Sequence, residues 1–235
     1  MSEARPNPIK NRLLSALPNS EYERLLPHLE PVSLTFKQII YAPNEPIEYV
    51  YFPNSGIISL VNLTEDGGTV EAATVGNEGM AGIPVLLGTD RMIGQAITQI
   101  VGDAVRMKAD VFKREVTPGS PLHNLLLRYT QALMNLISQS VACNRLHSVE
   151  KRCCRWLLLC QDRVQSNQFP LTQEFLAQML GVRRASVSVV AAILQKTGLI
   201  RYSRGRITIC DRAGLEASSC EYYRILKEEF DRLLS

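Results

Sequence analysis

The sequence predicts an α+β fold: an N-terminal antiparallel β-roll (a jelly roll), a long helix and a C-terminal winged helix-turn-helix. Three observations predict it. Short β-prone segments separated by turn residues fill positions 32–107. An apolar stripe with coiled-coil spacing begins at Pro121. Two short helical segments joined at Gly181 are followed by two β-prone segments.

Length and composition are those of a folded protein without a membrane segment. A chain of 235 residues is long enough for two modest domains, and 46% hydrophobic with 21% charged residues is typical of globular proteins. The longest uninterrupted apolar runs are far shorter than the roughly 20 residues that cross a bilayer. Residues 1–10 lack the apolar core of a secretory signal. We therefore expect a cytoplasmic protein with no membrane partner.

The N-terminal part begins with a short helix and continues as strands. Ser20 and Glu23 have the spacing of a capping box, and the helix is expected to end at Pro27. Seven β-prone runs follow, separated by Asn-, Pro- and Gly-containing turns: Leu34–Phe36, Ile39–Tyr41, Tyr49–Phe52, Ile57–Leu63, Thr69–Val75, Ala96–Ile100 and Ala104–Met107. This pattern indicates a small antiparallel roll, which we assign to residues 1–120 as a sensor domain. Such a roll either encloses a small ligand or is filled by side chains, and both interpretations stay open.

The apolar period then changes to that of a helix. From Pro121, apolar residues recur at spacings of 4, 3, 4 and 3: Leu122, Leu126, Tyr129, Leu133 and Leu136. Leu125, Ile137 and Val141 widen this stripe. We assign residues 121–147 to a long dimerisation helix with this stripe, of which one face can pack on the roll while the other meets a second copy of the chain. The alternative is an amphipathic helix that packs only within its own chain.

The C-terminal part, residues 148–235, carries the most informative motif. Thr172 is a predicted N-cap, with Glu174 in the first turn, where the helix dipole favours negative charge. This helix ends at Gly181, and a second helix is expected over Arg183–Lys196. Its predicted inner face consists of Val187, Val190, Ala191 and Leu194. Two short helices joined in this way form a helix-turn-helix.

A basic β-hairpin is predicted directly after the second helix. Its strands are 199–202 and 206–210, with Ser203, Arg204 and Gly205 in the turn. The segment 148–211 holds ten Lys or Arg and four Asp or Glu, a charge of +6 within a chain of +3, which leaves −3 for the rest. Only the C-terminal part is therefore expected to meet a polyanion such as DNA.

The expected DNA contacts lie on these two motifs. They are Thr172, Gln173, Arg183, Arg184, Ser186, Ser188, Val189, Arg204 and Arg206. Arg184 is the predicted base reader, since its guanidinium fork matches the O6 and N7 acceptors of guanine. Thr172 and Gln173, at a helix N-terminus, are suited to a phosphate, and the two wing arginines to the flanking backbone. A lone arginine would be interpreted as a solvated surface charge; the combination favours DNA.

The cysteines predict neither a disulfide framework nor a metal site. They are Cys143, Cys153, Cys154, Cys160, Cys210 and Cys220, without a C-x-x-C pair. His28, His123 and His147 show no metal spacing. Burial is the favoured interpretation, because free cysteine is among the most buried residue types. A redox or metal role is the alternative, since Cys153 and Cys160 share a helix face.

The chain resembles the Crp-Fnr superfamily of bacterial regulators, named for the cyclic-AMP receptor protein and Fnr. Leu171 to Ser188, LTQEFLAQMLGVRRASVS, is similar to the family's signature (I/L)T..eiA..lG.srETV.R. Val149 to Leu158 resembles the helix that opens the family's DNA-binding domain, and Tyr49 to Gly56 is like its yyi.sG stretch. The resemblance covers nearly the whole chain. It implies a two-fold dimer on DNA, switched by a small molecule or redox cofactor in a cyclic-nucleotide-binding-like roll.

The departures from the family concern the effector and the operator. Gly82, Met92 and Ile93 stand where cyclic-AMP-binding members have the glutamate, arginine and hydroxyl residue of their phosphate cassette. A shifted pocket would use Glu78, Gly79 and Arg91. We therefore expect an effector other than a cyclic nucleotide, or none, and no iron-sulfur or haem cofactor. Ala185 and Val189 replace a frequent glutamate and arginine, which predicts a different half-site.

The sequence thus predicts a dimeric transcription regulator that binds inverted-repeat operators in double-stranded DNA. RNA polymerase and a small-molecule effector are further candidate partners. No nucleophile, phosphate-loop or paired-histidine motif is present, so an enzyme is not expected. The alternative function is a ligand-sensing or protein-interaction module that has lost specific DNA binding.

Overall fold

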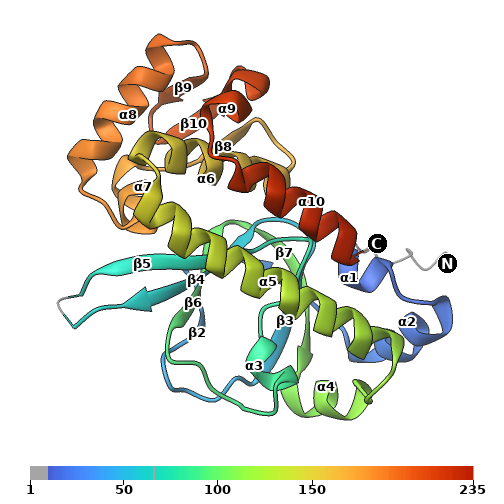
Figure 1. Cartoon of the computed structure of the whole chain (residues 1–235). Helices are drawn as coiled ribbons and strands as arrows, with labels where there is room; N and C mark the ends of the chain where they lie inside the picture. Colours follow the sequence, from blue (N-terminus) through green and yellow to red (C-terminus); the bar gives the residue numbers. More distant parts are fainter. Residues whose placement is uncertain (1–9, 66, 235) are drawn as a thin grey trace, which may run out of the picture.

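The computed structural model describes residues 10–65 and 67–234. The fold has three parts: an N-terminal β-roll, one long helix that runs along it, and a C-terminal helical part that carries a small sheet (Figure 1). The last helix of the chain returns to the roll and ends close to the first one (Figure 1).

The roll consists of two antiparallel sheets. One has the strand order β1-β7-β3, formed by Glu30–Leu34, Gly102–Lys108 and Tyr49–Pro53. The other has the order β2-β6-β4-β5, formed by Ile39–Tyr41, Gln95–Ile100, Ile57–Leu63 and Thr69–Val75. Phe52, Ile58 and Val75 are fully buried in the core of the roll. The predicted first strand is misplaced, because the β1 ladder runs over Glu30–Leu34 rather than 34–36.

Short helices close the ends of the roll. They are α1 (Arg12–Ser15), α2 (Asn19–Leu25), the 3-10 helix η1 (Leu26–His28), α3 (Ile83–Leu86) and α4 (Ala109–Glu115). The predicted capping box at Ser20 is wrong: α2 begins before Ser20, with Pro18 at the N-cap and no side-chain cap.

The long helix is α5, Pro121–Leu146. Ser120 caps it, accepting a hydrogen bond of 3.1 Å from the His123 backbone N–H, and Pro121 occupies the first turn, where its missing N–H is harmless. One face of α5 is buried against the roll and belongs to the roll's core cluster.

The C-terminal part is a winged helix-turn-helix. It comprises α6 (Val149–Val164), α7 (Gln173–Leu180) and α8 (Arg184–Lys196), with a sheet of order β8-β10-β9. The strands are Gln168–Pro170, Arg206–Ile209 and Ile200–Ser203. The predicted break at 166–170 is therefore incomplete, because Phe169 pairs with Ile207 and adds a third strand to the wing.

Two further helices, which the sequence patterns did not indicate, follow the wing. They are α9 (Arg212–Ser218) and α10 (Tyr222–Leu234). Helix α10 lies along α5 (Figure 1) and places Leu226, Phe230 and Leu233 in the same core cluster as Leu13 of α1. The C-terminal part is also packed on the roll, since Ile57 and Ile100 of the roll share a cluster with α6 and α7.

Among the described residues, no single helix has the length and hydropathy of a membrane span. Helices α7 and α8 have the length and composition of a membrane span only when they are taken together. They are bent by 112° with respect to each other.

Candidate nucleic-acid interface

Helix α8 presents an exposed, basic first turn. The predicted inner face, Val187, Val190, Ala191 and Leu194, is buried as expected. Arg183, the N-cap residue, and Arg184 are exposed, and so are Ala185 and Val189. Ser186 and Ser188 are half-buried beside them. The exposed side of α8 can therefore enter a groove without disturbing its packed side.

The turn between α7 and α8 is fixed by local hydrogen bonds. Thr172 caps α7, and its Oγ1 accepts a hydrogen bond of 3.1 Å from the Phe175 N–H. Gly181 ends α7 with φ +61°, and the Val182 N–H donates to the Ala177 carbonyl over 3.0 Å. This left-handed conformation favours glycine and turns the chain into α8.

Polar side chains link the two helices across this turn. Ser188 Oγ lies 2.7 Å from Gln173 Oε1, to which it donates. Arg184 Nε lies 3.9 Å from Glu174 Oε2, and both side chains are mostly exposed. The hydrogen bond between Gln173 and Ser188 links the start of α7 to α8. The exposed ion pair is weak, so Arg184 can exchange Glu174 for another acceptor.

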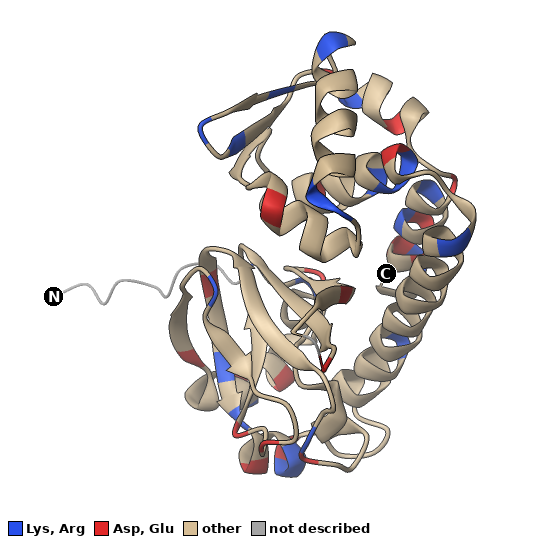
Figure 2. Ribbon diagram, turned by 90° about the vertical axis from the view of Figure 1, so that its left-hand side faces the viewer, with Lys and Arg blue, Asp and Glu red and all other residues tan. Residues whose placement is uncertain are grey.

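The wing lies beside the N-terminus of α7. The Leu171 N–H donates to the Gly205 carbonyl over 2.8 Å, and the Tyr202 hydroxyl donates to the Leu171 carbonyl. Arg204 takes φ +48° in the hairpin turn, and its side chain is exposed, like that of Arg206. Basic residues are visible along this hairpin in Figure 2.

The structure thus brings the predicted DNA contacts onto three adjoining elements: the start of α7, the first turns of α8 and the wing. Arg201, which is not among the predicted contacts, is exposed on β9 close to the wing turn. Its alternation with the buried Ile200 was the available signal. Sequence reasoning missed that Glu174 pairs with Arg184, which reduces the positive charge there.

The predicted effector residues lie on the segment between β5 and α3 and in the loop between α3 and β6. Glu78 is buried in an ion pair with Arg163 of α6, with 2.9 Å between Oε1 and Nε. A side chain at Gly79 would collide with Tyr129, and Gly82 precedes α3 at φ +114°. Arg91, Met92 and Ile93 lie in the loop before β6, where Ile93 is 87% exposed and Arg91 pairs with Asp90.

The predicted dimer stripe faces inward. Leu122, Leu126, Tyr129, Leu133 and Leu136 are buried within the chain, against the roll. The exposed apolar residues of α5 instead include Leu127, Met134 and Val141, at 46%, 60% and 67% exposure. Their spacing of seven is that of a coiled-coil seam. The physical reason for the correction is that α5 carries two apolar faces, and the roll covers the more apolar one.

The comparisons with known proteins agree with this architecture. Residues 151–218 match the model of the Crp-like helix-turn-helix domain. A search of curated proteins finds no match.

Several solved structures share the fold of most of the chain. FixK2 from Bradyrhizobium japonicum is 17% identical at a TM-score of 0.70, covering 82% of this chain and 98% of its own. A protein from Eubacterium rectale assigned to the Crp/Fnr family is 19% identical at 0.67, covering 87% and 96%. A CRP-family transcriptional regulator from Thermus thermophilus is 22% identical at 0.68, covering 80% and 96%.

Proposed function

We propose that this chain is a transcription regulator of the Crp-Fnr superfamily and that it binds specific sequences in double-stranded DNA; its Crp-like helix-turn-helix domain and the fold that it shares with solved structures support this. The observation that carries the proposal is the basic first turn of α8 next to the basic wing. Regulators of this family are not enzymes, and we propose no catalytic activity. We propose that the protein acts in the cytoplasm, because its proposed partner is DNA.

The proposed contacts follow from the exposed positions. Helix α8 enters the major groove, where Arg184 leaves Glu174 and donates to a guanine, and Val189 contacts a thymine methyl group. Thr172 and Gln173 hold a phosphate at the N-terminus of α7, and Arg204 and Arg206 hold the flanking backbone. Ser186 is a further contact to the DNA. Ser188 acts indirectly, because its hydrogen bond to Gln173 helps to position α8.

We propose that the active form is a homodimer on an inverted repeat. The exposed positions Leu127, Met134 and Val141 alternate with Thr130, Ile137 and Asn144 at spacings of three and four, which supports a parallel or crossed pairing of two α5 helices. A two-fold pair would set two α8 helices roughly 34 Å apart, one DNA turn.

The proposed effector is not a cyclic nucleotide, because Gly82, Met92 and Ile93, at the cassette positions, offer no carboxylate, guanidinium or hydroxyl group. An effector would act through its different affinity for two orientations of the C-terminal part about residues 144–149. RNA polymerase is the further partner that we propose for the DNA-bound form.

The test is selection of bound duplexes from a random DNA pool by the full chain, followed by affinity measurements on the selected site. Arg184→Ala is expected to weaken binding by about 1–3 kcal/mol and to lose base preference at one position per half-site. Arg204→Ala is expected to weaken all sequences alike and to reduce the salt slope by about 1. The matched control is Arg224→Ala, an exposed arginine paired with Glu228 on α10.

The alternative function is an interaction or ligand-sensing module. It is supported by the engagement of Arg184 and Ser188 with Glu174 and Gln173. A wild-type chain whose weak DNA affinity is unchanged by salt and by both arginine substitutions would favour this alternative.

A further inference from the structure

Three side chains that can ligate a metal, two of them distant in the sequence from the third, meet where the long helix ends. Cys143 lies in the last turn of α5, His147 is the C-cap residue of the same helix, and Cys220 lies between α9 and α10. Their ligand atoms all lie within 4.8 Å of one another, and the two sulfurs are 3.5 Å apart. Both cysteines are buried.

These distances fit one cation held by the three side chains. A tetrahedral zinc ion with Zn–S bonds of about 2.3 Å separates two sulfur ligands by about 3.8 Å. The observed separation of 3.5 Å is within a few tenths of an ångström of that value.

The imidazole of His147 is oriented in the way that metal sites orient theirs. Its Nε2 lies 3.3 Å from the Glu221 carboxylate, and its ring packs edge-on against Tyr222 with 5.3 Å between ring centroids. Its Nδ1 is buried and has no hydrogen-bond partner among the described residues. A histidine that ligates a metal through one nitrogen commonly donates the other N–H to a carboxylate. Nδ1 is therefore the nitrogen that is available to a ligand.

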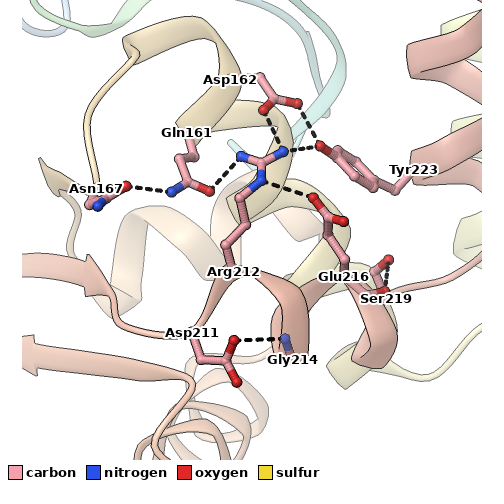
Figure 3. A network of polar contacts seen from close by, with 9 residues as sticks. All are labelled: Gln161, Asp162, Asn167, Asp211, Arg212, Gly214, Glu216, Ser219 and Tyr223. Atoms are coloured by element: carbon pink, nitrogen blue, oxygen red, sulfur yellow. Dashed lines mark hydrogen bonds and ion pairs between the residues drawn. The ribbon is translucent and has the colours of Figure 1, made fainter.

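The corner that carries Cys220 is held in place independently of any metal. Figure 3 shows Arg212 of α9 at the centre of a network that joins α9 and α10 to α6. Arg212 is 2.8 Å from Asp162, from Glu216 and from the Gln161 side-chain oxygen, and the Tyr223 hydroxyl donates to Asp162 over 2.8 Å. Cys220 is thus presented to α5 by a fixed support.

We propose that Cys143, His147 and Cys220 form a binding site for a thiophilic divalent cation, with Zn²⁺ as its preferred occupant. Two thiolates and one imidazole select zinc over the hard cations magnesium and calcium. Binding releases the thiol protons and leaves a fourth coordination position for water or an exogenous ligand. The bound cation joins the C-terminal end of α5 to the α9–α10 corner.

This arrangement gives the cation a mechanical role. It would join the end of α5 and the short link between α5 and α6, which contains His147, to the α9–α10 corner of the C-terminal part. Occupancy therefore restrains the orientation of the C-terminal part, whatever DNA sequence that part recognises. This metal site lies outside the roll pocket that the sequence suggests and uses other residues. In the sequence, only the spacing of four between Cys143 and His147 indicates it.

The test is metal binding to the full chain, purified with a phosphine reductant and stripped of metal. One zinc per chain is expected, and cobalt should give the thiolate charge-transfer band and the visible ligand-field bands of a four-coordinate ion. Zinc at about 100 times its Kd should raise Tm by about 5–10 °C. Cys220→Ser and His147→Gln should abolish these signals, and Glu221→Gln should weaken binding by about 10- to 100-fold.

Two matched controls separate this site from adventitious binding. Cys153→Ser removes a buried thiol outside the cluster, and Cys210→Ser removes the exposed one; both should keep one zinc per chain. Circular dichroism of each variant checks that it is folded, and the milder Glu221→Gln variant carries the test if a cysteine variant unfolds. The proposal is overturned if the folded wild type takes up no zinc, if Cys210→Ser alone abolishes uptake, or if the metal-free thiols of Cys143 and Cys220 are recovered as a disulfide that zinc does not prevent.

Discussion

At Glu78, a residue that the sequence pattern links with effector binding, the structure shows a buried contact between the roll and α6. Its carboxylate lies 2.9 Å from Arg163 Nε, and both side chains are less than 10% exposed. Burial of a charge is costly unless the charge is paired, so each partner requires the other.

Glu78→Gln is therefore expected to lower the free energy of unfolding by about 3–5 kcal/mol, because it leaves the Arg163 charge buried without its partner. Urea unfolding followed by circular dichroism measures this. Glu228→Gln, which breaks the exposed pair with Arg224, is the matched control and should change stability by less than about 1 kcal/mol. Equal effects of the two substitutions would contradict the structural role of Glu78.

A second carboxylate at the same boundary makes stability depend on pH. Glu71 of β5 accepts hydrogen bonds from Ser59, over 2.7 Å, and from the Trp156 indole of α6, over 2.8 Å. Burial raises the pKa of Glu71 from its ordinary value of 4.5 to about 7. Between these two values the folded state keeps a proton that the unfolded state has lost, so stability falls as pH rises through this window.

The expected loss between pH 5 and pH 8 is at most about 3 kcal/mol, from roughly 1.4 kcal/mol per pH unit for one proton. Glu71→Gln should flatten this part of the pH profile of urea unfolding, because the amide does not ionise. Glu65→Gln, at an exposed position, should leave the profile as it is in the wild type. A wild-type profile that rises from pH 5 to 7 would show that ionisation of Glu71 is not its main determinant.

At the scale of elements, α5 shows why an apolar period alone does not tell which partner a helix meets. The stripe from Leu122 to Leu136 has coiled-coil spacing but is buried against the roll. A second, less continuous seam through Leu127, Met134 and Val141 is exposed. Which seam lies inside depends on contacts with strands that are distant in the sequence, and the period does not contain that information.

Substitution in the exposed seam tests the proposed dimer. Met134→Glu places two like charges against each other in a pair of α5 helices and is expected to weaken dimerisation by at least about tenfold in sedimentation equilibrium. Leu87→Glu, similarly exposed but on the roll, is the control and should leave the association constant unchanged. A stable dimer in the Met134→Glu variant would exclude this seam as the interface.

The helix-turn-helix was predictable because its signals are local. The Thr172 cap, the left-handed Gly181 and the buried face from Val187 to Leu194 all follow from residues within a few positions of one another. By contrast, Cys143 and Cys220 are 77 positions apart, and α10 packs on elements at the other end of the chain. Spacing patterns describe residues that are close in the sequence, so they do not predict these long-range contacts.

At the scale of the whole molecule, α10 makes the two parts of the chain dependent on each other. Phe230 and Leu226 follow the winged part in sequence but are buried in the core of the roll. Arg12 of α1 and Asp231 of α10 are joined by an ion pair of 3.1 Å. The roll therefore shares one core with the helix that extends the C-terminal part.

Phe230→Ala is expected to lower the stability of the roll by about 3–5 kcal/mol, because it opens a cavity in the core that the roll shares with α5 and α1. Ile225→Ala, at a more exposed position of the same helix, should cost much less. Calorimetry of the wild type should show one transition. Two separate transitions, of which Phe230→Ala affects only that of the C-terminal part, would mean that the roll and the C-terminal part unfold independently.

The return of α10 to the roll also orders events during translation. The strands of the roll emerge from the ribosome before α5, and α10 emerges after every other element that packs in that core. Until then, the apolar side chains that α10 will cover stay exposed to water, a condition that favours chaperone binding and aggregation. Completion of the N-terminal domain is thus a late step of biosynthesis, although its residues are the first to be made.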